Sequence, residues 1–294
     1  MAEAYTTTTT GIGALRQDYL DAAMEIACTN IDDLVVLPAV KVVNIPRGNS
    51  LVASHPVFTR DAGAAHTEGT PLEAVAADIA RIQATAAGFA VVYCIEDTLQ
   101  IGSAYNLEDF LAQRAAEALM DYLENLLIAD FTNASTSYNG TGVDLTVAGF
   151  LAAKVQLAYT NNARGAMRAV LYPTGVKHLI ESVTASSGAV WGNSTLDASI
   201  LSRNVADGFA GVFCGVPVYS STHVATSGAD KIGAIFTEGQ NSASPAMMAA
   251  IAAMPYVKRQ DNTHEIATDL SIAMVAGVTE VVDANRVKII SHAA

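Results

Sequence analysis

The chain has 294 residues, of which 51% are hydrophobic and 15% charged, and its formal net charge at pH 7 is −13. This composition excludes an intrinsically disordered chain, and the acidic balance argues against a protein that clamps nucleic acid through its phosphates. Globular proteins carry about 25% charged residues, so the deficit indicates surface covered by copies of the same chain, although an alanine-rich composition alone gives a similar figure.

No run of about 18 apolar residues occurs, and the N-terminus has neither a basic region nor an apolar core of a signal peptide. We therefore expect a soluble protein without a recognisable secretion signal. The three cysteines lie far apart and form no CxxC pair, which is typical of small buried hydrophobic residues in a reducing compartment: Cys28, Cys94 and Cys214.

The N-terminal part reads as an arm followed by a short helix and an extended segment. Residues 1–14 have no apolar period, whereas 15–27 carry apolar residues at three- and four-residue spacing, which predicts an amphipathic helix. Residues 34–45 are rich in β-branched side chains but contain Pro38, and this combination predicts an edge strand or an extended segment.

A long excursion follows between residues 46 and 70, with apolar residues spaced as in a hairpin. A stretch of this length is usually a functional loop or one that packs on another chain. Thr70 to Glu73 have the form of a capping box and favour a helix to about Ile82, yet the residues from Ala80 onward are more strand-like. The residues alone leave the conformation of 71–82 open.

The clearest element is a helix from Asn106 to Phe131, which spans about 37 Å at 1.5 Å per residue. Asn106 is a good N-cap, and Glu108 and Asp109 are fully explained by the positive end of the helix dipole. One apolar stripe runs along the helix, and its other face carries the polar residues Gln113, Arg114, Glu117, Asp121 and Glu124.

The rest of the chain alternates helices and strands. We expect helices at 146–159, at 173–183 and at 245–254, and strands at 167–172, 211–221, 231–239, 268–282 and 286–290 with a turn at 283–285. Met247, Met248 and Met254 fit core filler better than a metal site. Trp191 is a lone aromatic residue in a Gly-rich loop, where it could anchor a ligand or a neighbouring subunit, or simply pack.

No catalytic template fits the sequence. His264–Glu265 begins like a zinc-protease HExxH motif, but the second ligand position is Thr268. Phosphate-binding glycine loops and a GxSxG elbow are absent, and the six histidines are scattered. We therefore name no catalytic, cofactor-binding or metal-binding residue and expect a protein that is not an enzyme.

Four segments carry a resemblance to a known family: the helix at 106–131, VLYPTGVKHLI at 170–180, GFAGVFCGVPVYSSTHV at 208–224, and VVDANRVKII at 281–290. In this order they resemble a tailed-bacteriophage major capsid protein of the HK97 fold, and the resemblance covers most of the chain. It implies an α+β, HK97-like fold with an N-arm at 1–34, an E-loop region at 42–85, a P-domain at 86–145 and 255–294, and an A-domain at 146–254. It also favours the returning arm of a β-hairpin over a helix at 71–82.

The resemblance implies a structural function. Copies would form hexamers and pentamers of an icosahedral shell that encloses double-stranded DNA without sequence-specific binding, in a virion assembled in the host cytoplasm. A scaffolding protein separate from this chain, a portal and optionally a decoration protein would be partners, and no membrane would be involved. Two alternatives stay open, an encapsulin-like bacterial nanocompartment shell and an α/β enzyme with an unrecognised site. The family's lysine cross-link is not expected, because 42–85 contains no lysine.

Overall fold

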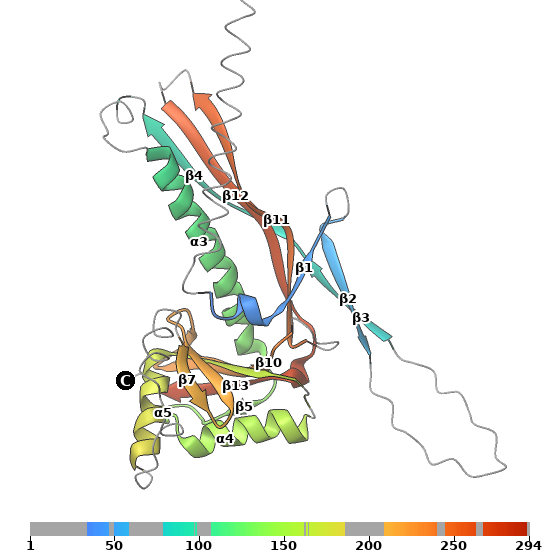
Figure 1. The fold of residues 1–294 in the computed structure, drawn as a ribbon, viewed down its shortest axis with the longest axis vertical. Helices are drawn as coiled ribbons and strands as arrows, with labels where there is room; N and C mark the ends of the chain where they lie inside the picture. The colour runs from blue at the N-terminus through green and yellow to red at the C-terminus, as the bar shows by residue number, and fades with distance from the viewer. Residues whose placement is uncertain are drawn as a thin grey trace, which may run out of the picture.

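The computed structural model describes residues 34–46, 50–58, 79–96, 98, 107–161, 163, 165–185, 209–239, 245–262 and 267–292. The helix expected at 15–27, the loop around Trp191, and residues 71–78 lie outside this part. The described residues form a four-stranded sheet, a seven-stranded sheet and a two-stranded ribbon, together with helices that lie between and beside them (Figure 1).

The four-stranded sheet has the order β1-β11-β12-β4 and packs on the long helix α3, which spans Leu107–Asp130. Its strands are β1 (Lys41–Asn44), β4 (Ala87–Glu96), β11 (Met247–Asn262) and β12 (Ala267–Glu280). β1 runs parallel to β11 at one edge, and the other pairs are antiparallel. The predicted helix is thus confirmed to within one residue at each end, and the edge position expected from Pro38 is confirmed for β1.

The ribbon pairs β2 (Val52–Phe58) with β3 (Ile79–Thr85) in antiparallel register and projects away from the rest of the chain (Figure 1). Only Ala86 separates β3 from β4, so the ribbon is an outward extension of the four-stranded sheet. Residues 79–82 are therefore strand, as the resemblance indicated and against the local capping box.

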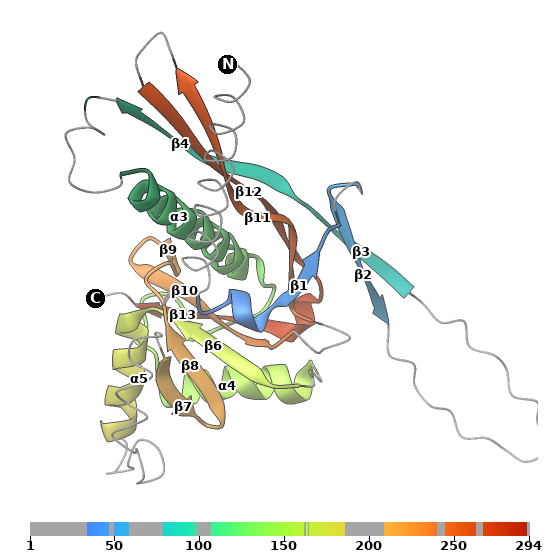
Figure 2. The same ribbon diagram turned by 45° about the horizontal axis from the view of Figure 1, so that its top comes forward.

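The seven-stranded sheet has the order β5-β13-β10-β6-β8-β7, with β9 paired to β10. Its strands are β5 (Ser137–Tyr138), β6 (Met167–Leu171), β7 (Phe209–Phe213), β8 (Val216–Ser220), β9 (Ala225–Ser227), β10 (Asp230–Thr237) and β13 (Arg286–His292). Two helices lie against it, α4 (Val147–Val155), continued by a π-helical turn at Gln156–Thr160, and α5 (Pro173–Ala185) (Figure 2).

Alternation along β6 separates two hydrophobic cores. Val170 joins the core that contains α3 and the four-stranded sheet, whereas Ala169 and Leu171 join the core under α4 and α5. Because successive strand residues point to opposite faces, the seven-stranded sheet is apolar on both sides. The helix α3 therefore lies between the two sheets, and α4 and α5 form the outermost layer.

The predicted helix at 245–254 is wrong, because these residues begin strand β11. Residues 245–251 are all buried, and β11 pairs with β1 on one side and β12 on the other. A short apolar run buried on both faces has no period that separates strand from helix, so tertiary pairing overrides the helix propensity of alanine and methionine. Met247 and Met248 fill the core as expected, but Met254 is 50% exposed.

The sheet pairing also differs from the expected division of the chain at residues 145/146 and 254/255. β11 runs through the second boundary without a break, and β13 pairs with β10 instead of joining β11 and β12. β5, expected with the long helix, pairs with β13 in the same seven-stranded sheet. The 3-10 turn at Asp283–Asn285, where the sequence indicated a turn, separates β12 from β13 and lets the chain change sheets.

Candidate functional site

Three polar contacts join elements of the two sheets, and two of them also fix the path of the chain near residue 34. They centre on Glu124, Arg168 and Arg286, none of which the sequence singled out. No helix among the described residues is long and apolar enough to span a membrane. Within the same residues, no group of three or more His, Cys, Asp or Glu side chains could hold a metal ion. The candidate site described below is this set of polar contacts.

Glu124 projects from α3 and is completely buried. One carboxylate oxygen, Oε1, accepts hydrogen bonds from the backbone N–H groups of Val35, at 2.9 Å, and Val36, and Oε2 accepts from the N–H of Leu37 at 2.9 Å. These three donors belong to the segment that leads into the 3-10 turn Leu37–Ala39. One side chain thus binds three successive peptide groups to the C-terminal third of the long helix, and we call this contact the Glu124 clasp.

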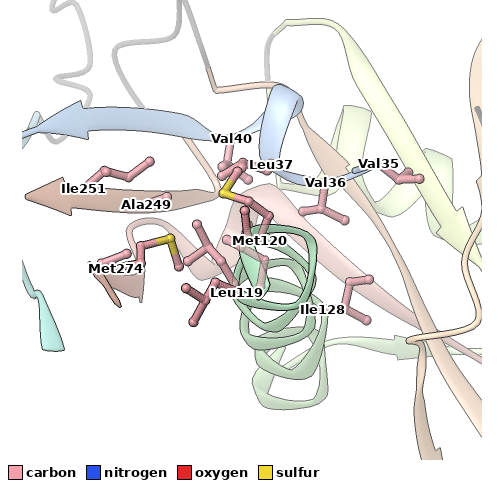
Figure 3. Close-up of a cluster of buried hydrophobic side chains, with 14 of the residues drawn as sticks. Val35, Val36, Leu37, Val40, Leu119, Met120, Ile128, Ala249, Ile251 and Met274 are labelled. Atoms are coloured by element: carbon pink, nitrogen blue, oxygen red, sulfur yellow. The ribbon is translucent and has the colours of Figure 1, made fainter. Parts of the chain in front are cut away.

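The apolar side chains around the clasp come from distant parts of the chain. Val35, Val36 and Leu37 belong to one buried cluster with Met120 of α3 and with Ile251 and Met274 of the strands (Figure 3). Because water is excluded there, the backbone N–H groups need an internal acceptor. The carboxylate of Glu124 supplies it.

A signal for the clasp exists in the sequence, although the sequence reasoning placed Glu124 on the polar face. In a helix, residues four apart lie in one row. This row is entirely buried, and after Glu108 in the first turn it is apolar except for Glu124: Ala112, Ala116, Met120, Glu124 and Ile128. A carboxylate that interrupts such a row is buried and needs partners.

Burial raises the pKa of the Glu124 carboxyl above its ordinary value of 4.5, and the three backbone donors and the nearby His223 offset part of this effect. His223 lies in the loop after β8, and its Nε2 is 2.7 Å from a carboxylate oxygen of Asp121, one turn before Glu124 on α3. The loop is thereby held to the same stretch of the helix.

Arg168, on β6, binds the same N-terminal segment from the other side. Its Nη1 donates to the backbone carbonyl of Val35 at 2.8 Å, and its Nη2 is 2.9 Å from Oε1 of Glu238. The guanidinium also stacks on the ring of Tyr219, 4.5 Å from its centroid. Since Glu124 holds the N–H of Val35 and Arg168 its carbonyl, this peptide segment connects α3 to the seven-stranded sheet.

Arg286 forms a second connection, at the point where the chain passes from β12 to β13. Its guanidinium is completely buried and contacts three carboxylates. Nη1 is 2.6 Å from Asp130 at the end of α3, Nη2 pairs with Glu280 at the end of β12, and Nε is 3.3 Å from Asp283. The last turn of α3, β12 and β13 therefore meet at one buried cation.

The acidic residues around Arg286 differ in protonation behaviour. Burial raises the pKa of Glu280, and the charge of Arg286 offsets this only in part. Burial also opposes ionisation of Asp283, but hydrogen bonds from Ser135 and Arg286 outweigh it and lower the pKa of Asp283. Asp283 therefore stays ionised to lower pH than an ordinary aspartate.

The root of the β2–β3 ribbon is closely packed against β12. A Cβ atom at Gly277 would lie 2.2 Å from the backbone oxygen of Thr85, which no real contact allows. Within the ribbon, Nη2 of Arg81 donates a hydrogen bond to Oγ of Ser54 at 2.8 Å. Only glycine at position 277 lets the ribbon leave the sheet along this path.

The burial of several single residues differs from what the sequence predicted. Cys94 and Cys214 are exposed, so the expected burial is wrong for both, and Cys28 lies outside the described residues. Glu108 is completely buried, with Oε1 3.8 Å from Nη2 of Arg259 on β11, so the helix dipole does not fully explain it. His178, one of the six scattered histidines, is buried, with Nδ1 3.5 Å from Oδ1 of Asp144.

No family model and no curated protein sequence matches this chain. Solved structures do match. The chain is similar to the capsid of an empty GTA particle, with a TM-score of 0.67 and 15% identity over 88% of this chain and 90% of that one. It is equally similar to the capsid of Ralstonia phage GP4, with a TM-score of 0.67 and 9% identity over 90% and 92% of the two chains.

A third similar structure is the holo-SrpI encapsulin complex from Synechococcus elongatus, with a TM-score of 0.62 and 10% identity over 89% of this chain and 88% of that one. Identities this low establish the fold and nothing finer. In each case 88% or more of both chains is aligned, so the likeness extends over most of the fold. The chain therefore has the α+β, HK97-like fold of these capsid and encapsulin proteins.

Proposed function

We propose that this chain is the major capsid protein of a tailed bacteriophage and assembles into a closed shell. The fold carries the proposal, because capsid structures align with 87–90% of this chain. Its role is then structural and not enzymatic. The scarcity of charge agrees with this role, since a subunit enclosed by neighbours needs less charged surface than a soluble monomer.

In this proposal the parts of the fold take the family's names. The P-domain consists of α3 and the four-stranded sheet, the A-domain of the seven-stranded sheet with α4 and α5, and the E-loop has the β2–β3 ribbon as its base. The N-arm precedes the Glu124 clasp. Compared with the division expected from sequence, β11 moves into the P-domain, and β5 and β13 move into the A-domain.

Hexamers and pentamers of this subunit would build an icosahedral virion shell around double-stranded DNA. A net charge of −13 supports a container that holds DNA without binding it tightly. A separate scaffolding protein and a portal would take part in assembly in the host cytoplasm, and a decoration protein is an optional further partner.

An encapsulin-like compartment is the second candidate, favoured by the similarity to the SrpI complex and to a virus-like particle from Pyrococcus furiosus with a TM-score of 0.61. Both are built on the same fold, so the architecture does not separate them from phage capsids. The contents of the particle do, because one shell encloses DNA and the other encloses a protein cargo.

Electron microscopy of the purified protein tests the assembly. We expect shells or capsomers, alone or with a co-expressed scaffolding protein. Monomers or dimers under all conditions would contradict a shell function and favour the enzyme alternative. Nuclease-protected double-stranded DNA in native particles would then support the capsid, and a co-purifying enzyme without DNA would support the encapsulin.

A further inference from the structure

The helix α4 is apolar on both of its long faces. Its inner face packs into the core of the seven-stranded sheet through Phe150, Ala153 and Leu157, which are fully buried. The ring of Phe150 contacts Phe213 with centroids 5.2 Å apart. This side of the helix is satisfied within the chain.

The outer face carries large apolar side chains that nothing among the described residues buries. Leu151 and Val155, four residues apart on α4, are each 43% exposed, and Tyr159, in the π-helical turn that continues the helix, is 79% exposed. Ala148 and Ala152 complete this face. We call these five residues the α4 outer face.

The polar residues of the helix lie to the sides of this face and contact their own subunit. Lys154 donates a hydrogen bond from Nζ to the backbone carbonyl of Cys214, in the turn between β7 and β8. Gln156 accepts from the hydroxyl of Tyr138 and donates to Asn161. Neither side chain places charge over the α4 outer face.

A surface helix normally turns polar residues outward, and a helix that is apolar all round is normally buried. The seven-stranded sheet covers only one side of α4. The α4 outer face thus has the composition of a covered surface, because a helix face exposed to solvent normally carries at least a few charged residues.

We propose that the α4 outer face is covered by a second copy of this chain in the assembled shell, an inference that rests on the proposed capsid function. Each copy carries a net charge of −13, so copies repel one another and approach most easily through faces without charge. The exposed patch is on the order of 300 Å², less than the about 800 Å² per partner of an independent complex. It is suited to one contact among several in a closed assembly.

Replacing Val155 by lysine tests this contact. Lysine is a better helix former than valine and favours the C-terminal end of a helix, so Val155→Lys keeps the subunit folded. It also makes the net charge less negative, which by itself eases association. A loss of assembly therefore reports burial of this position. We expect at least a tenfold lower yield of shells in sedimentation, with unchanged circular dichroism.

Two controls accompany the variant. Thr222→Lys adds the same charge at an exposed position after β8, and Val155→Ala keeps the helix face apolar. Both are expected to assemble nearly as well as the wild type. Equal loss of shells in Thr222→Lys would attribute the effect to charge and would overturn the proposal.

Thiol labelling of Val155→Cys identifies what covers the face. The labelling rate is read by peptide mass spectrometry, so that the natural cysteines are followed separately. We expect rapid reaction with maleimide in unassembled subunits and at least tenfold protection in shells. Protection in both states would assign the cover to another segment of the same chain, and equal reactivity in both would show no cover. Either result overturns the proposed contact, but the capsid function still stands as long as the wild type forms shells. If the wild type forms no shells, both proposals are contradicted.

Discussion

Removal of the Glu124 carboxylate should destabilise the subunit far more than removal of an exposed carboxylate from the same helix. In Glu124→Ala, the backbone N–H groups of Val35, Val36 and Leu37 lose their acceptor in a region closed to water. An unsatisfied buried donor costs about 1–3 kcal/mol. Three donors together would lower the free energy of unfolding by about 3–9 kcal/mol. The variant also no longer buries a carboxylate, which offsets part of this cost, so we expect a loss of about 3–5 kcal/mol.

Glu124→Gln should show only part of this loss, because it keeps two of the three hydrogen bonds. The amide oxygen, placed where Oε1 lies, still accepts from Val35 and Val36, but the amide NH2 then faces the N–H of Leu37. One donor is left without an acceptor, so we expect a loss of about 1–3 kcal/mol. The matched control is Glu117→Ala, at an exposed position of α3, with an expected change of about 0.5 kcal/mol or less.

The assay is urea unfolding of unassembled subunits at pH 7.5, followed by circular dichroism, because assembly would add its own stabilisation. The expected order of stability is wild type, then Glu124→Gln, then Glu124→Ala. If Glu124→Ala unfolds at the same urea concentration as Glu117→Ala, the three hydrogen bonds do not hold the segment and the clasp is refuted.

The remaining predictions concern pH, the buried cation and the root of the ribbon. Burial raises the pKa of Glu124 in the folded chain above 4.5, so the stability advantage of the wild type over Glu124→Gln is largest below about pH 4.5, falls as the pH rises through the raised pKa and then stays constant. Urea midpoints of both proteins from pH 4 to 8 measure this advantage. An advantage that grows with pH would contradict the prediction. Arg286→Ala leaves three carboxylates around a buried site, so we expect a loss of about 3–5 kcal/mol in urea unfolding, against about 0.5 or less for the exposed Arg114→Ala. Gly277→Ala should lower the free energy of unfolding by about 1–3 kcal/mol, because the new Cβ atom clashes with the ribbon. In the control Gly88→Ala the Cβ atom meets nothing within 4 Å, so this variant should be as stable as the wild type or more stable. Equal melting temperatures of the two variants would exclude the close approach at Gly277.

Elements with a strong period of their own could be predicted from the sequence. The helix α3 combines an apolar stripe with a polar face over seven turns, and α4 begins where Thr146 caps it, with Oγ1 accepting from the N–H of Gly149. In both cases the local signal and the tertiary packing agree. Strand β11 shows the opposite case, since its first residues are good helix formers and only pairing with β1 and β12 makes them strand.

The clasp joins Glu124 to residues 87 to 89 positions away, and the buried cation joins Arg286 to the distant Asp130, so no local pattern specifies either contact. Val35 and Glu124 are separated by 89 residues, and Asp130 and Arg286 by 156. For Glu124 the otherwise apolar row of α3 is a usable signal that the residue is buried, but it does not identify the partners. For Arg286 the flanking Glu280 and Asp283 are close in sequence and look like an exposed charged turn, so nothing local indicates that the guanidinium is completely buried.

The buried polar contacts inside the subunit and the apolar α4 outer face together explain the low charge content in a new way. Some of the few charged residues are used inside the subunit, among them Glu108, Glu124, Asp230 and Arg286, all nearly or completely buried. These four charges are withdrawn from the outer surface, and the α4 outer face carries none. Charge placed inside fixes the geometry of one subunit, because buried ion pairs and hydrogen bonds tolerate few alternative arrangements. Apolar residues placed outside favour contact between subunits, and a shell needs both, since rigid copies must meet at the same angle each time.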